Sequence, residues 1–389
     1  MLFGKKSQPL LGLDITTSSV KLIELSRSGK RYRVEAYSAE PTPPSSVNEK
    51  AIVDAKAVGE AIRRAVKRAG AKATDVAIAI SGDAAITKVI QMPSSLSERD
   101  LEGQVEIQAD QYIPFPMEEV SFDYEIVGPN ENDPELMDVL LVATRTENVD
   151  QRESAVQAAG LNTHIVDVEA FALENACQLL SHQIPDNGTN QTVAIVDIGA
   201  SSTTFSVLQD LKVVYTRDFA FGGQQLTEEI MRTYGLSMED AGRAKKQGGL
   251  PSNYQPEVLE PFVDDMTQQV SRSLQFYLAS GGGREQPDMI LVCGGCANIP
   301  GIADVISSRV GIPTEVGDPL GQMAALSQVS IPGLWKHKYW FVMVKQSFLA
   351  VFTKPRLARQ SARYRSWVIY RALAFCSAQH RMCRTKQNC

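Results

Sequence analysis

Two stretches of this 389-residue sequence place a carboxylate and a row of small hydroxyl residues between apolar strands. The first is GLDITTSSVKLIEL (residues 12–25), and the second is VAIVDIGASSTTFSVL (residues 193–208). A tight turn rich in glycine, serine and threonine presents N–H and hydroxyl groups to an anion, with no bulky side chain in the way. An aspartate at the end of the preceding strand can hold a hydrated Mg²⁺ that bridges phosphate oxygens. Two such turns facing each other across a cleft would clamp a polyphosphate from both sides.

A third stretch, MILVCGGCANIPGI (residues 289–302), runs from an apolar strand into Gly294 and Gly295. Glycines in such a loop let a purine or ribose approach the backbone. Cys293 and Cys296 also form a C-x-x-C motif, which raises the alternative of a zinc or redox site. Structural zinc needs four ligands, and no second C-x-x-C or histidine pair lies nearby. We therefore expect these cysteines to be buried structural residues.

The elements that must position these stretches follow the pattern of an α/β fold, because strands alternate with helices. The segment at 54–70 repeats apolar residues along one helical face and precedes a buried strand at 73–82. The second half repeats the order, with the strand pair at 193–208 followed by a strand at 211–217 and a helix at 224–234. A Gly/Lys-rich break, a long helix near 255–279 and the strand MILVCGG come next.

This repeated order predicts two related lobes, each of which opens with a strand, an aspartate, a turn and a second strand. Only the first lobe has an insertion, which reads as a compact α/β module. The predicted division is lobe I at 1–82 and 151–185, an inserted subdomain at 83–150, lobe II at 186–330, and an atypical basic tail at 331–389.

Composition limits the class of protein. Apolar residues make up 43% and charged residues 22% of the chain, as in a soluble globular protein. The first 330 positions contain no uninterrupted apolar run of about 18 residues, so we expect no transmembrane helix there. The N-terminal segment lacks the features of a secretory signal, and the six cysteines show no disulfide framework, which favours the cytosol.

The C-terminal part is a different kind of sequence. Residues 320–389 contain no Asp or Glu but 12 of the 39 Lys and Arg residues, together with all three tryptophans. The rest of the chain therefore carries 27 basic against 45 acidic residues, a net charge of −18, which argues against nucleic acid as a partner. The tail has two interpretations: an interfacial membrane segment, or a product of translation in the wrong frame. We favour the second.

The two phosphate hairpins, a connecting helix and a Gly-Gly loop, in this order, look like the actin/Hsp70/hexokinase superfamily of nucleotide-binding folds. Within it, YIPFPMEEVSFDYEIV (112–127), FALENA (171–176) and GGLP (248–251) resemble the PilM family, whose members are FtsA-related proteins of type IV pilus assembly. The resemblance runs from about residue 8 to residue 328. It implies an actin-like, two-lobed α/β fold with a small inserted FtsA-like subdomain.

The resemblance also implies roles for individual residues. The first phosphate loop would comprise Asp14, Thr16, Thr17 and Ser18, and the second Asp197, Gly199, Ser201, Ser202 and Thr203. Asp14 and Asp197 would lie near Mg²⁺ and bind it through water. Gly294, Gly295 and Asn298 match the adenosine loop, while Gly222, Gly223 and Lys245 match the stretch whose lysine approaches the nucleoside.

Two of these residues have a second interpretation. Lys245 could equally lie on a solvated face. Glu169 stands where relatives place the residue that orients attacking water, but a carboxylate there also suits the N-terminal end of a helix dipole.

These roles imply an ATP- and Mg²⁺-binding scaffold with weak or absent turnover, since Glu169 is the one candidate to orient water. The family resemblance further implies that the inserted subdomain and the adjacent lobe hold the N-terminal cytoplasmic peptide of the membrane protein PilN. It places the protein at the cytoplasmic face of the inner membrane, with other proteins of the pilus inner-membrane complex as partners. The alternatives are a small-molecule kinase and a filament-forming ATPase, the second of which requires self-association.

Overall fold

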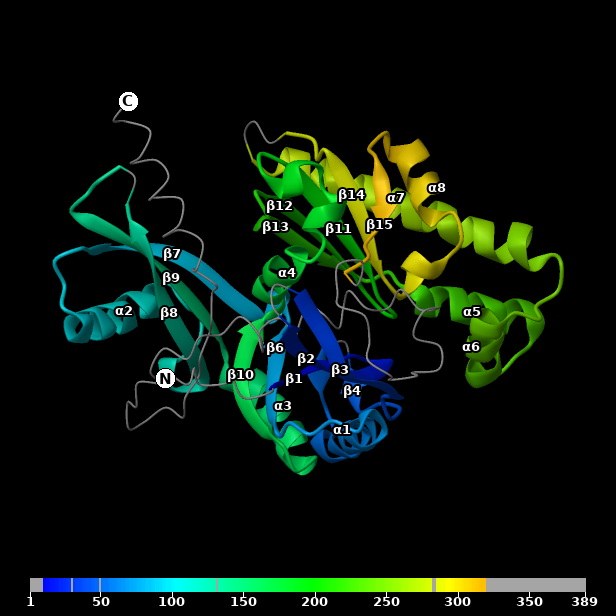
Figure 1. Ribbon diagram of the computed structural model, residues 1–389, viewed down its shortest axis with the longest axis horizontal. Helices are drawn as coiled ribbons and strands as arrows, with labels where there is room; N and C mark the ends of the chain where they lie inside the picture. Colours follow the sequence, from blue (N-terminus) through cyan, green and yellow to red (C-terminus); the bar gives the residue numbers. More distant parts are fainter. Residues whose placement is uncertain (1–9, 29–30, 49, 131, 282–284, 320–389) are drawn as a thin grey trace.

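The computed structural model describes residues 10–319 except 29–30, 49, 131 and 282–284. It contains two five-stranded sheets, which Figure 1 shows one above the other, and a smaller sheet to one side. The predicted tail, 331–389, lies outside the described residues. Among the helices of the described part, none is long and apolar enough to cross a membrane.

The first sheet has the strand order β10-β6-β1-β2-β3. Its strands are β1 (Leu10–Ile15), β2 (Ser19–Ser28), β3 (Arg31–Pro41), β6 (Asp75–Ile80) and β10 (Asn162–Val168). A short hairpin of β4 (Val47–Asn48) and β5 (Ala51–Ile52) follows β3. Strand β1 pairs antiparallel with β2 and parallel with β6, so the first hairpin lies in the middle of the sheet.

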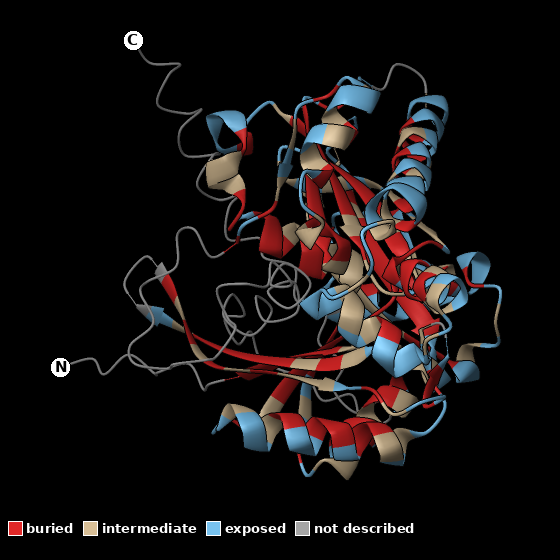
Figure 2. Ribbon diagram, turned by 90° about the vertical axis from the view of Figure 1, so that its right-hand side faces the viewer, coloured by how far each residue is buried: buried red, intermediate tan, exposed pale blue. Residues whose placement is uncertain are grey.

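Helices α1 (Ala55–Ala69) and α3 (Thr146–Ala158) pack on one face of this sheet. Asp54 caps α1 by accepting a hydrogen bond from the N–H of Ala57, and Gly70 ends it in the left-handed conformation (φ 63°). One face of α1 contributes buried residues to the core of the lobe, as the amphipathic pattern predicts. Figure 2 shows the corresponding pattern across the structure, with buried residues concentrated in the strands and on the inner faces of the helices.

The second sheet has the order β13-β12-β11-β14-β15. Its strands are β11 (Thr192–Ile198), β12 (Thr203–Gln209), β13 (Lys212–Phe219), β14 (Met289–Gly294) and β15 (Thr314–Val316). The helices that accompany it are α5 (Gly223–Tyr234), α6 (Met238–Gln247), α7 (Glu260–Ala279) and α8 (Ile302–Val310). Helix α4 (Glu169–Cys177) joins the two sheets through a shared core that includes Leu173, Ile195 and Leu291.

The segment predicted as a Gly/Lys-rich break contains a helix, α6, so that prediction was wrong. Ser237 accepts a hydrogen bond from the N–H of Asp240 and begins the helix, while Gly248 ends it. Buried Ala241 anchors the helix in the core of the lobe. A single buried position is too weak a periodic signal to reveal a ten-residue helix in a sequence.

The third sheet has the order β7-β9-β8, with strands β7 (Ala85–Pro93), β8 (Val120–Pro129) and β9 (Leu136–Arg145). Helix α2 (Glu98–Tyr112), capped by Ser97, covers one face. The other face contributes Leu140 and Val142 to a small cluster with Val168 of the first lobe. Two faces of one sheet are thus used, one for the subdomain's own core and one for its junction with the first lobe.

Candidate functional site

The first hairpin is built around Thr16, in the turn between β1 and β2. Its hydroxyl donates to the carbonyl oxygen of Ser19 (3.0 Å) and accepts from the N–H of Ser19 (3.2 Å). Its own N–H donates to the same carbonyl (3.1 Å). These three bonds hold a compact turn that leaves Ser18 exposed at its tip.

The second hairpin, between β11 and β12, has the same plan. The N–H of Gly199 donates to the carbonyl oxygen of Ser202 (2.9 Å), and Ser201 lies exposed at the tip. Buried Thr203 donates its hydroxyl to the carbonyl oxygen of Phe221 (2.7 Å), which ties the hairpin to the chain that enters α5. Asp197 occupies the next-to-last position of β11, as Asp14 does in β1.

The two hairpins meet across the lobes. The hydroxyl oxygens of Thr17 and Ser201 are 3.1 Å apart and form a hydrogen bond between residues 184 positions apart in the sequence. The predicted phosphate-loop residues therefore lie together at one place between the two large sheets. Such a pair of hydroxyl-bearing tips is suited to an oxyanion, because both tips can donate to it at once.

Lys21 belongs to this site, although our sequence reasoning did not select it. It lies opposite Asp14 in the β1–β2 ladder, and its Nζ contacts Oδ2 of Asp14 at 2.7 Å. Both side chains are nearly buried, with 13% and 6% of their surfaces exposed. Lys21 is therefore the cation of the first hairpin, and its charge is paired with Asp14. The sequence does contain a signal that could have identified Lys21. It stands seven residues after Asp14, and in a hairpin with a short turn this spacing places it on the neighbouring strand, opposite Asp14.

The N-terminus of α5 approaches the second hairpin closely. The N–H groups of Gly223 and Gln224 donate to the carbonyl oxygens of Gly199 (3.0 Å) and Ala200 (2.8 Å). A Cβ at Gly222 would clash with the backbone of Ala200, which explains the requirement for glycine there. The glycines predicted to approach a nucleoside thus also fix the helix against the phosphate hairpin.

Lys245 does not lie on a solvated face. Its Nζ donates to the carbonyl oxygen of Gly223 (2.6 Å) and to the hydroxyl of Thr227 (2.5 Å). Burial lowers the pKa of Lys245, and burial raises the pKa of the neighbouring Cys296 thiol to about 11. Lys245 is therefore held against the beginning of α5, with a protonated thiol as its neighbour.

Gly294 and Gly295 begin the loop after β14. Gly294 has φ 84°, and a Cβ there would lie 2.6 Å from Oδ1 of Asp197 and still closer to the carbonyl of Ile198. Asn298 ends the loop's single 3₁₀ turn and donates from its side chain to the carbonyl oxygen of Gly295 (3.1 Å). This glycine loop therefore lies directly beside the second hairpin.

Glu169 begins α4 and is half-buried. Its charge acts on Lys50 and on buried Arg152. Burial lowers the pKa of Lys50, but Glu169, Asp218 and Asp83 outweigh this effect and hold the pKa above its ordinary value. Glu169 is thus part of a group of opposite charges, and its proposed action on water remains a prediction.

Lys50 also joins the two lobes. It lies in the β4–β5 hairpin and forms an ion pair with Asp218 of β13, which in turn accepts a hydrogen bond from Thr204 of the second hairpin (2.5 Å). The guanidinium of Arg152 donates to the carbonyl oxygens of Lys50 (2.9 Å) and Ala79 (3.1 Å). A continuous polar chain therefore runs from the second hairpin to the end of β6.

No group of three or more His, Cys, Asp and Glu side chains suited to a metal occurs in the described part of the chain. Asp14 and Asp197 stand at matching positions of the two hairpins, and two carboxylates suffice for a Mg²⁺ that keeps most of its water and binds phosphate oxygens. The residues present therefore fit a hydrated Mg²⁺ that arrives with a polyphosphate.

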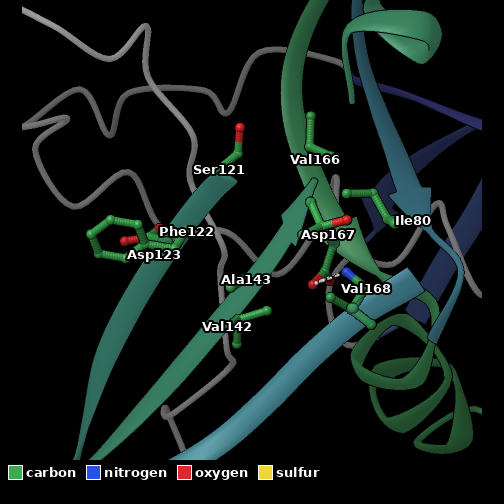
Figure 3. A pocket seen from close by; sticks show the side chains of 11 residues that line it. Ile80, Ser121, Phe122, Asp123, Val142, Ala143, Val166, Asp167 and Val168 are labelled. Carbon is green, nitrogen blue, oxygen red and sulfur yellow. Dashed lines mark hydrogen bonds between the residues drawn. The ribbon is translucent and has the colours of Figure 1, made fainter. Parts of the chain in front are cut away.

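A second candidate site is a small hollow between the inserted subdomain and lobe I, with an enclosed volume of about 20 Å³, which is enough for one water molecule. Its walls come from β8 and β9 on one side and from the ends of β6 and β10 on the other (Figure 3). Asp123 and Asp167 are its two carboxylates. The segment YIPFPMEEV lies within the inserted subdomain. Phe115 packs against the subdomain core, while Tyr112 is 43% exposed beside Lys88.

Comparison with known proteins decides the family. A profile described as "Type IV pilus assembly protein PilM" matches residues 12–345, which is most of the chain. The chain belongs to the PilM family. The match extends beyond residue 328, where we expected the resemblance to end, and so includes the first fifteen residues of the predicted atypical tail.

Curated relatives and solved structures resemble the chain over most of its length. The chain is 23% identical to the cell division protein FtsA of Bacillus subtilis, over 79% of each chain. A structure titled "PilM-PilN type IV pilus biogenesis complex" covers 89% of this chain and 99% of its own, with 26% identity and a TM-score of 0.71. MreB5 of Spiroplasma citri bound to ADP covers 87% of this chain and 95% of its own, with 14% identity and a TM-score of 0.45. As a PilM family member, the chain is an FtsA-related type IV pilus assembly protein.

We expect Gly222→Ala to destabilise this PilM by about 1–3 kcal/mol, because the new methyl group would displace the backbone of Ala200. The matched control is Gly242→Ala in α6, where a Cβ meets open space and the better helix propensity adds up to about 1 kcal/mol. Urea unfolding followed by circular dichroism measures both. Equal midpoints for the two variants would contradict the close packing of α5 on the second hairpin.

Proposed function

We propose that this PilM is an ATP- and Mg²⁺-binding scaffold that docks the N-terminal cytoplasmic peptide of PilN. It would act at the cytoplasmic face of the inner membrane, within the type IV pilus assembly complex. The observation that carries the nucleotide part is the hydrogen bond between Thr17 and Ser201, which brings both hydroxyl-rich hairpins to one place. The similarity to the PilM–PilN complex carries the docking part.

In this proposal the phosphates lie between the hairpin tips and replace the contact between Thr17 and Ser201. Lys21 neutralises their charge, and Asp14 orients Lys21 and shares a hydrated Mg²⁺ with Asp197. Ser18 and Ser201, which are exposed at the two tips, add hydroxyl donors. The glycine loop at 294–295 and Lys245 border the nucleoside, since both pack against the same hairpin.

Turnover is expected to be slow. Hydrolysis requires a water molecule positioned for attack and stabilisation of the charge on the γ-phosphoryl group. Glu169, the candidate to orient water, faces Lys50 and Arg152, and these cations compete for its carboxylate. ATP would then act mainly by holding the two lobes together, because a ligand that binds only the closed form stabilises that form.

The docking part rests on the similarity to the PilM–PilN complex, and we place it at the junction between the inserted subdomain and lobe I, which the hollow marks. The hollow lies between two parts of the chain, is lined largely by apolar side chains, and opens beside the edge of the inserted sheet. An extended peptide can pair with an exposed strand edge, and β8 is an edge strand of the inserted sheet. Docking at this place and nucleotide binding between the large lobes use different residues.

We expect Lys21→Met to weaken binding of ATP and Mg²⁺ at least tenfold, because the variant removes the nearly buried cation of the first hairpin. The control is Lys212→Met, an exposed lysine at the beginning of β13. Calorimetry measures the affinity of both variants. Unchanged affinity in Lys21→Met would refute the nucleotide site.

A phosphate-release assay on the unaltered protein is expected to give far less than one turnover per second. Several turnovers per second would refute the scaffold role.

We expect Ala85→Phe to weaken binding of the PilN peptide at least tenfold and to leave ATP binding unchanged. Ala85 lies at this junction, at the beginning of β7, so a phenyl ring there obstructs the proposed docking place. Val89→Phe is the matched control on the same strand, at a position that is 52% exposed and does not line the hollow. Calorimetry with the peptide, alongside a panel of sugars and acetate, tests docking against the kinase alternative. Binding of a sugar but not of the peptide would favour the kinase.

A further inference from the structure

Lys50 and Asp218 form an ion pair between the two large lobes. Lys50 lies in the β4–β5 hairpin of lobe I, and Asp218 lies near the end of β13 in lobe II. Their side chains are 24% and 16% exposed, so salt screens this pair less than a pair on the open surface. The contacts proposed for the phosphates use neither residue, so the pair calls for another explanation.

Each partner of this ion pair is held in place on its own side of the junction. The backbone carbonyl of Lys50 accepts a hydrogen bond from Arg152 (2.9 Å), and its Nζ also lies 3.8 Å from Oδ1 of Asp83. Oδ1 of Asp218 accepts a hydrogen bond from the hydroxyl of Thr204 (2.5 Å), while Oδ2 contacts Lys50. The pair therefore forms without ordering two free side chains, which is a cost that weakens most surface ion pairs.

The register of the second sheet connects the ion pair to the nucleotide site. Asp197 lies opposite Thr204 in the β11–β12 ladder, and Thr204 lies opposite Asp218 in the β12–β13 ladder. Residues directly opposite each other share one face of a sheet, so these three side chains form a row. Strands β11 and β13 are two strand spacings, about 10 Å, apart. Lys50 thus contacts lobe II at one end of a row whose other end is the carboxylate proposed to hold Mg²⁺.

We propose that the ion pair of Lys50 with Asp218 is a latch that holds the two lobes in the arrangement that binds ATP. This inference rests on the proposed nucleotide site between the hairpins, and it adds how that site is kept closed. The contact of Thr17 with Ser201 and the ion pair both require the same placement of lobe I against lobe II. A ligand that binds only the closed form has an affinity proportional to the closed fraction of the free protein, so a latch that raises this fraction raises the affinity for ATP.

The latch predicts an effect of Asp218 opposite in sign to that of simple electrostatics. A carboxylate near a bound polyphosphate repels it, so removal of the Asp218 charge alone would strengthen ATP binding. If Asp218 acts through the latch, its removal lets the lobes separate and weakens ATP binding. A direct contact of Lys50 with the phosphates would make Lys50 necessary for binding, but not Asp218. Asp218 is therefore the residue that distinguishes the latch from both other roles.

The experiment is calorimetry of the full chain with ATP and Mg²⁺, on Lys50→Met, Asp218→Asn and the double variant. Asparagine keeps an oxygen that can accept from Thr204, so Asp218→Asn removes the charge and retains that hydrogen bond. The matched control is Asp264→Asn, which neutralises the carboxylate of an ion pair with Arg309 inside lobe II. Small-angle X-ray scattering without nucleotide measures whether the lobes separate, and circular dichroism shows whether each variant is folded.

Each single variant of the latch is expected to bind ATP at least threefold more weakly than the unaltered protein. The double variant is expected to lose no more affinity than the weaker single variant, because both changes break the same contact. Asp264→Asn is expected to bind ATP as the unaltered protein does. Without nucleotide, the Lys50 and Asp218 variants are expected to have a larger radius of gyration than the control, and saturating ATP and Mg²⁺ should remove the difference.

Binding of ATP by Asp218→Asn as tightly as by the unaltered protein, or more tightly, would overturn the latch. So would equal radii of gyration for all the proteins without nucleotide, or single effects that multiply in the double variant. Failure of the unaltered protein to bind ATP would instead overturn the proposed nucleotide site, and the scattering would still decide whether the ion pair holds the lobes together. Because asparagine has the shape of aspartate, Asp218→Asn decides the question even if Lys50→Met does not fold.

Discussion

The contact between Thr17 and Ser201 sets the constraint on which the rest of the arrangement depends. For two hydroxyls 184 residues apart to lie 3.1 Å from each other, both large sheets must present the tips of their hairpins to the same point. Each tip is short because its turn is closed by bonds within the hairpin, through Thr16 in one lobe and Gly199 in the other. The glycines at 222 and 294 then bring α5 and β14 against the second hairpin without side chains between them.

The charged residues connect this point to the rest of the molecule. Lys50 reaches from the first lobe to Asp218, whose other partner is Thr204 in the second hairpin. Arg152 links the same lysine's backbone to the end of β6, and Ile80 at that end lines the hollow beside the inserted subdomain. In our account, nucleotide and peptide therefore bind at opposite ends of one polar chain. The ion pair of Lys50 with Asp218 crosses between the lobes, and Arg152 ties the backbone of Lys50 to that of Ala79, so in our account a displacement of one lobe is transmitted to the other end.

The sequence was sufficient to predict the strands, the two hairpins and the glycine loop, because each depends on local residue patterns. Apolar runs interrupted by Asp14 and Asp197 predicted the hairpins that the structure contains. The ion pair of Lys50 with Asp218 was out of reach, since its partners are 168 residues apart and each resembles an ordinary surface charge. Asp167 was missed for a different reason: its burial arises from the inserted sheet, which folds over the end of β10. Helix α6 was missed because its single buried residue, Ala241, leaves no helical period to detect.

Hydrogen exchange of the two hairpins, measured with and without saturating ATP and Mg²⁺, tests the central claim most directly. Our account predicts that the amides of residues 14–19 and of residues 199–204 are slowed together, because one polyphosphate contacts both tips. The same nucleotide should leave the outer strands of the inserted subdomain unchanged. Slowing in one hairpin only, or in neither, would contradict a clamp formed from both lobes.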